Sequence, residues 1–119
     1  MSLRQIIGLV LVLLTGTLKL SANIEFFDGS YEEALELAKK ERKIIFIDAY
    51  ASWCGPCKQM AKNVFTQDQV GEFYNSTFIN LKLDMEKAEA AVFKQSFSVS
   101  AYPTLFFIDG QENLVHKVV

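Results

Sequence analysis

The sequence predicts a single domain of the α/β class, with a central mixed β-sheet flanked by helices. The chain has 119 residues, half of them hydrophobic, and its six glycines and two prolines leave no long flexible linker. Segments with helical spacing alternate with short runs rich in β-branched residues. Two of these runs, residues 44–47 and 104–108, have no polar alternation, which is typical of strands buried on both faces.

The N-terminal half is expected to contribute two strands and a helix. Residues 24–27 alternate and predict a short first strand. Ser30 is followed three residues later by Glu33, so a capping box is expected to start a helix there. That helix should end in the basic cluster at residues 39–43, because cations are favourable near a helix C-terminus. Residues 44–47 follow as the central strand.

The next elements are two helices, a strand and a further helix. Helical spacing begins at Pro56 and is interrupted at residues 66–68, after which a shorter helix is expected. Residues 78–83 predict the third strand. Asp84 is expected to cap a helix that includes residues 88–93, because aspartate is a favoured N-cap residue.

The last predicted element is a β-hairpin. Residues 104–108 form its first strand, Asp109-Gly110 is a strong two-residue turn signal, and residues 112–119 return as an edge strand. The expected order is therefore β-α-β-α-β-α-β-β. A C-terminal helix, which normally covers the open face after such an edge strand, is missing from this sequence.

The first 22 residues have the layout of a signal peptide. Arg4 supplies a positive charge, an apolar stretch over residues 6–18 follows, and Ala22 is a small residue that can precede a cleavage point. The apolar stretch is shorter than the about 20 residues that cross a bilayer comfortably. We therefore expect residues 1–22 to direct export to the periplasm or outside the cell, and residues 23–119 to form the domain. A retained anchor is the alternative, and only then would a membrane be a partner.

The chain's only two cysteines lie in the stretch Trp53–Lys58. If a helix starts here, residues three apart share a face, and a slight tightening brings two sulfurs to disulfide distance. A disulfide closing so short a loop adds little stability, so exchange is favoured over a structural role. Cys54 is the expected accessible nucleophile, because a helix N-terminus lowers the pKa of a thiol. Cys57 is expected to lie deeper and resolve the mixed disulfide, with Gly55 and Pro56 shaping the turn.

Cys57 needs a proton acceptor, and Asp48 at the end of the central strand is the candidate. Burial should raise the pKa of this carboxyl, which suits general base work near neutral pH. The alternative, that Asp48 only caps the strand or pairs with a lysine, stays open, and Lys82 is the nearest partner. No metal is expected, because structural zinc takes four ligands and the chain offers two cysteines and His116. No other cofactor is expected.

A net charge of −2 argues against nucleic acid as a partner, because a phosphate binder needs a basic face. The stretch Trp53–Lys58 resembles the active site of the thioredoxin family. Tyr102-Pro103 resembles that family's second landmark, a cis-proline loop opposite the cysteines, and Asp48 stands where the family places a buried acid. The resemblance covers residues 24–119. It implies the thioredoxin fold, a cis Pro103, and a Tyr102 backbone that pairs with an extended substrate.

Residues 64–70 are similar to an insertion in exported thioredoxin-like proteins and in the soluble domains of membrane disulfide reductases. The Gly-Pro pair between the cysteines resembles reducing members. Asn80 stands where a lysine often accompanies the buried acid, and Tyr102 is bulkier than the usual aliphatic residue, which implies a different choice of substrate.

These features predict a thiol–disulfide oxidoreductase that acts on protein substrates, in the reducing direction, and exchanges electrons with a thiol redox partner. Trp53, Pro56 and Tyr102 are expected to form an apolar collar that docks the substrate, together with Gly55 and Pro103. A different class of function stays open. The domain could instead be a peptide-binding or holdase module that uses the same collar without redox turnover.

Overall fold

The computed structural model describes residues 22–119. The predicted signal peptide or anchor, residues 1–22, lies outside this part of the chain except for Ala22. Among the helices formed by residues 22–119, none is both long enough and apolar enough to cross a membrane.

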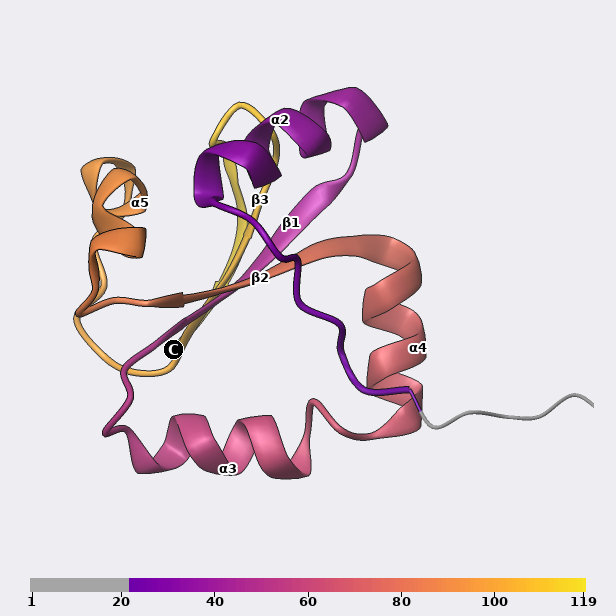
Figure 1. Cartoon of the computed structure of the whole chain (residues 1–119), viewed down its shortest axis with the longest axis vertical. Coiled ribbons are helices and arrows are strands. Elements are labelled where there is room, and N and C mark those ends of the chain that lie inside the picture. Colours follow the sequence, from indigo (N-terminus) through magenta and orange to yellow (C-terminus); the bar gives the residue numbers. More distant parts are fainter. Residues whose placement is uncertain (1–21) are drawn as a thin grey trace, which may run out of the picture.

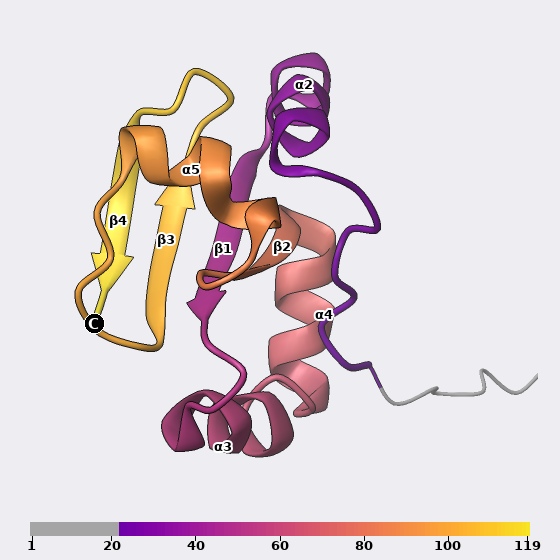
Figure 2. The same ribbon diagram turned by 60° about the vertical axis from the view of Figure 1, so that its left-hand side comes forward.

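Four strands form one mixed sheet in the order β2-β1-β3-β4, as Figure 2 shows. Parallel pairing joins β1 to β2, whereas β1 with β3 and β3 with β4 pair antiparallel. The mixed sheet predicted from the sequence is therefore confirmed. The strands are β1 (Ile44–Tyr50), β2 (Phe78–Asp84), β3 (Thr104–Ile108) and β4 (Leu114–Val118).

The position of each strand follows from its sequence. The apolar run of β1 is buried from Ile45 to Ala49, as expected for a strand with neighbours on both edges and helices on both faces. In contrast, β4 is exposed along its whole length and pairs only with β3. The site described below is built on β1, the most buried strand.

Two helices cover each face of the sheet, and Figure 1 views the sheet nearly edge-on. On one face lie α2 (Tyr31–Glu41) and the short α5 (Ala91–Ser96), which follows a 3₁₀ turn at Ala88–Ala90. On the other face lie α3 (Gly55–Asn63) and α4 (Asp68–Thr77).

The predicted capping box of α2 is confirmed. The Ser30 hydroxyl accepts from the Glu33 N–H, and the Glu33 carboxylate accepts from the Ser30 N–H. The helix ends at Arg42, which adopts a left-handed backbone conformation with φ 55° and donates its N–H to Ala38. The basic residues Lys39 and Lys40 lie in the last turn, as predicted.

The predicted first strand, residues 24–27, is wrong. This segment runs beside β2 but makes only one backbone hydrogen bond to it, from Phe27 N–H to the Asn80 carbonyl. The Ile24 N–H donates to the Phe65 carbonyl, and the Asn75 amide on α4 bonds to the backbone of Asn23 and Glu25. Because these backbone groups are paired elsewhere, the segment forms no ladder with β2.

Two local predictions are also corrected. Asp84 does not cap the following helix; its carboxylate accepts from the Glu86 N–H two residues later, a local turn that competes with capping. The connection after β3 is longer than the expected Asp109-Gly110 turn. The Asp109 carboxylate accepts from Gln111 and Asn113, and the left-handed residue is Glu112, with φ 64°.

Candidate functional site

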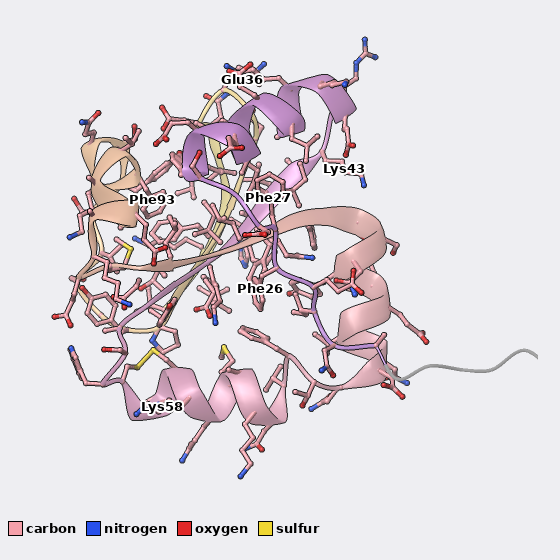
Figure 3. The ribbon with its side chains drawn as sticks, viewed as in Figure 1. Phe26, Phe27, Glu36, Lys43, Lys58 and Phe93 are labelled. Carbon is pink, nitrogen blue, oxygen red and sulfur yellow. A yellow bond between two sulfur atoms is a disulfide. The ribbon has the colours of Figure 1, made fainter. Side chains whose placement is uncertain are left out.

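The two cysteines meet at the start of α3 and form a disulfide, visible as the yellow bond beside Lys58 in Figure 3. Their Cα atoms are 5.3 Å apart. Cys54 is the N-cap of the helix, and its sulfur accepts a hydrogen bond from the Cys57 N–H at 3.1 Å. Pro56 occupies the first turn, where the N–H that it lacks has no helical partner. After reduction, a thiolate at Cys54 would be stabilised by this N–H and by the positive end of the helix dipole.

Both cysteines are buried in the oxidised form. Cys54 is 2% exposed and Cys57 is 5% exposed, so the expected difference, with Cys54 accessible and Cys57 deeper, is wrong for this form. The reason is tertiary: the side chains of Tyr50 and Tyr102 pack against the pair.

Asp48 lies on β1 and shares its face with Phe46, because alternate residues of a strand point the same way. This is the face that α3 covers. Asp48 is 5% exposed, and its Oδ1 atom has no hydrogen-bond partner. Burial raises the pKa of this carboxyl to about 6, and the Lys82 ammonium opposes that rise. An acid with this pKa is mostly ionised at pH 7 and ready to accept a proton.

A cavity of about 230 Å³ connects this carboxyl with the disulfide. Asp48, Cys57 and Lys82 all contribute to its lining, together with Ser52 and Lys58 at its sides. Cys57 and Asp48 therefore border one open space, an arrangement that the sequence could not specify.

Lys82 is held beside Asp48 by the strand register. The two residues are Cα partners in the parallel pairing of β1 with β2. The Lys82 ammonium lies over the aromatic rings of Tyr50 and Phe26, 5.3 Å and 5.7 Å from their centroids. This placement keeps a positive charge near the mouth of the cavity. Asn80, on the same face of β2, instead donates its amide to the Tyr74 carbonyl.

The loop before β3 forms the other side of the site. The Tyr102–Pro103 peptide bond is cis, which confirms that prediction. The Tyr102 ring packs against the cysteine cluster and meets the Trp53 ring edge-on, with centroids 5.9 Å apart. Trp53 itself is 65% exposed.

The expected collar is only partly closed. Gly55 and Pro56 are exposed, and a Cβ built on Gly55 would touch nothing within 4 Å. Open space therefore surrounds the turn between the cysteines, where a substrate chain can approach. One residue at this site, Glu86, was not predicted from the sequence; its carboxylate accepts a hydrogen bond from the Trp53 indole. No motif marks it, because the two residues are 33 positions apart.

Residues 26–110 match the model of a family described as thioredoxin-like. This region contains both cysteines, Asp48, Trp53 and the cis-proline loop. It covers well over half of the chain, so the match establishes the family.

Curated relatives support the same assignment. The chain is 33% identical over 78 residues to the thiol:disulfide interchange protein DsbD of Yersinia pestis, covering 65% of this chain and 13% of that protein. It is 35% identical over 80 residues to thioredoxin-1 of Drosophila melanogaster, covering 67% of this chain and 68% of that protein. The chain thus spans only a small part of the first of these relatives.

Solved structures show the same fold. A structure of a putative disulphide-isomerase from Bacteroides thetaiotaomicron is 40% identical, with a TM-score of 0.71 over 85% of this chain and 84% of that one. Thioredoxin NaTrxh from Nicotiana alata is 26% identical, with a TM-score of 0.62 over 87% and 86% of the two chains. The predicted thioredoxin fold is confirmed.

Proposed function

Because the chain belongs to the thioredoxin-like family, we propose that it is a thiol–disulfide oxidoreductase that reduces disulfides in protein substrates. One observation carries this proposal: the Cys54–Cys57 disulfide lies at a helix N-terminus and shares a cavity with a buried carboxyl whose pKa is near neutral. A disulfide that served only stability would need neither feature.

The first step forms a mixed disulfide. The Cys54 thiolate of the reduced protein attacks one sulfur of the substrate disulfide, and the other substrate sulfur leaves as a thiolate. The Cys57 N–H, which bonds to the Cys54 sulfur in the oxidised form, stabilises the attacking thiolate.

The second step releases the substrate. Cys57 gives its proton to Asp48, across the cavity that both line, and its sulfur attacks the Cys54 sulfur of the mixed disulfide. The Cys54–Cys57 bond forms, and the second substrate sulfur leaves as a thiolate that takes up a proton. Two electrons have then passed to the substrate. A thiol redox partner must return two electrons before the next turnover.

Trp53, Tyr102 and the cis Pro103 support docking of an extended substrate chain beside Cys54, since they form an apolar surface next to it. The relatives named thiol:disulfide interchange proteins support the same substrate class. The signal-like residues 1–22 support export, to the periplasm or beyond it, as the setting in which this chain meets protein disulfides.

Single cysteine variants test the proposal. Cys57→Ala should trap a mixed disulfide with an oxidised protein substrate, because Cys54 can still attack and nothing resolves the product. Cys54→Ser should lose at least about a thousandfold in insulin reduction, since the nucleophile is gone. Non-reducing gels and mass spectrometry identify the trapped species.

Two results would contradict the proposal. The first is that both variants reduce insulin as fast as the unmodified protein. The second is that the unmodified protein shows no redox turnover, while the variant with Ser at both positions binds unfolded chains as well as the unmodified protein does. That second result would establish the holdase function instead.

A further inference from the structure

An acidic side chain holds the exposed tryptophan beside the disulfide. The Trp53 indole N–H donates to the Glu86 carboxylate and so links the start of α3 to the loop after β2. This is the single hydrogen bond recorded for either side chain in the described part of the chain. A charged acceptor makes it stronger than a bond between neutral groups.

The hydrogen bond is the outer end of a series of contacts that reaches the sulfurs. Glu86 holds Trp53, the Trp53 ring stands edge-on against Tyr102, and the Tyr102 ring packs on the Cys54–Cys57 cluster. At the inner end, Cys54 is only 2% exposed although its neighbour Trp53 is 65% exposed. Tyr102 therefore covers the disulfide, together with Tyr50, and Trp53 supports Tyr102 from outside. We call these two rings the Trp53–Tyr102 cover.

Hydrogen bonds of neighbouring residues hold the loop that carries Glu86. The Glu86 N–H donates to the carboxylate of Asp84, which is 1% exposed, and the Asp84 N–H donates to Glu89. Met85, between them, is 1% exposed and belongs to the core under α5. A carboxylate on a loop held in this way can keep the exposed Trp53 indole in one position.

We propose that Glu86 is a positioning residue that controls access to the disulfide by fixing the Trp53–Tyr102 cover. This inference rests on the proposed function, since it concerns which thiols and peptides reach the sulfurs. With the cover fixed, an extended chain that lies along the cis-proline loop can displace Tyr102 locally, whereas other thiols are kept out. Release of the indole loosens the cover and removes that selection.

The chain offers a direct probe, because Trp53 is its only tryptophan. Acrylamide quenching and the fluorescence anisotropy of the oxidised protein report how firmly the indole is held. The rate of reduction by dithiothreitol reports access: the dithiol gives two electrons and two protons to the Cys54–Cys57 pair and becomes a cyclic disulfide.

Three variants separate the hydrogen bond from the charge. Glu86→Ala removes both, Glu86→Gln keeps an acceptor oxygen without the charge, and Glu72→Gln removes the same charge from an exposed position on α4. Glu86 is exposed, so its substitutions should leave the fold intact.

We expect Glu86→Ala to raise both the quenching constant and the dithiothreitol rate, the latter about fivefold, which corresponds to about 1 kcal/mol. Glu86→Gln should stay within about twofold of the unmodified protein, and Glu72→Gln should match it. The inference is overturned by unchanged quenching in Glu86→Ala, by an unchanged rate despite a freed indole, or by equal effects of the Ala and Gln variants at 86. None of these measurements requires turnover, so a failure of the proposed function in insulin reduction would be recognised separately.

Discussion

The two faces of the sheet are built differently. On the α2/α5 face, Phe93, Phe106 and Ile108 form a tightly packed core and are at most 1% exposed, although a cavity of about 360 Å³ lined by Tyr31 and Leu81 lies beside it. On the α3/α4 face, Phe46 is fully buried, but Phe107 and most other aromatic residues around it are only partly covered. The buried acid Asp48 and the disulfide belong to the α3/α4 side, next to an open cavity.

The α2/α5 face therefore contributes mainly to stability, whereas the α3/α4 face carries the candidate redox site. A tightly packed apolar core contributes most of the hydrophobic free energy of folding. A face with a partly covered surface can hold a titratable carboxyl that exchanges protons with solvent. Burying that carboxyl lowers the stability of the domain, and the apolar packing on the opposite face offsets this loss.

The largest expected effect compares two neighbours on β3 that point to opposite faces. Phe106→Ala should lower the free energy of unfolding by about 3–5 kcal/mol, because it leaves a cavity beside Phe93 in the tightly packed core. Phe107→Ala should cost only about 1–2 kcal/mol, since Phe107 is half-buried. Chemical denaturation of both variants measures the difference. Equal losses would show that the two faces contribute alike.

The second prediction concerns the free-energy cost of burying the Asp48 carboxyl. Burial raises the pKa of Asp48 from an ordinary 3.8 to about 6, so the folded state holds this proton more tightly than the unfolded state. Tighter proton binding by Asp48 therefore stabilises the folded state fully below about pH 4, and this stabilisation is lost as the pH rises through about 6. Asp48→Asn should therefore be more stable than the unmodified protein above pH 6, by about 2–3 kcal/mol.

The same variant should be a poor oxidoreductase. Without the carboxylate, resolution of the mixed disulfide by Cys57 should slow about a hundredfold near pH 7. Thermal unfolding at pH 4 and pH 8, with stopped-flow resolution kinetics, checks both halves. A stability difference that is the same at the two pH values would contradict the assignment of a raised pKa to Asp48.

The smallest expected effect tests how strongly the charge of Lys82 shifts the pKa of Asp48 on the α3/α4 face. Lys82→Met removes the positive charge that lowers the pKa of Asp48 but keeps a long side chain over Tyr50. The midpoint of the pH profile for resolution should move upward, by less than about one unit, because an exposed charge acts weakly. Lys62→Met, on the exposed part of α3, is the matched control. A midpoint that falls, or moves equally in the control, would exclude this role for Lys82.

Most strands and helices were predictable because their signals are local. The apolar run of β1, the capping box at Ser30 and the helical spacing after Pro56 each act over a few residues. The first strand was predicted wrongly because pairing is not local: alternation at residues 24–27 shows that a strand is possible, but contacts with Asn75 keep the segment from pairing.

The candidate site divides in the same way. The pair Cys54 and Cys57, and the cis-proline loop that Tyr102 opens, follow from motif and resemblance. The burial of both sulfurs and the contact between Glu86 and Trp53 could not be predicted, because each depends on residues brought together from distant segments.

By itself, the sequence determined the chemistry available to this protein: two thiols three residues apart at a helix start, and an acid directly after an apolar run. Only the tertiary structure decided how exposed those groups are and what they contact, since the strand register places Lys82 beside Asp48 and the packing of Tyr50 and Tyr102 covers the sulfurs. Reactivity is set by burial and neighbouring charge, and both are properties of the folded chain.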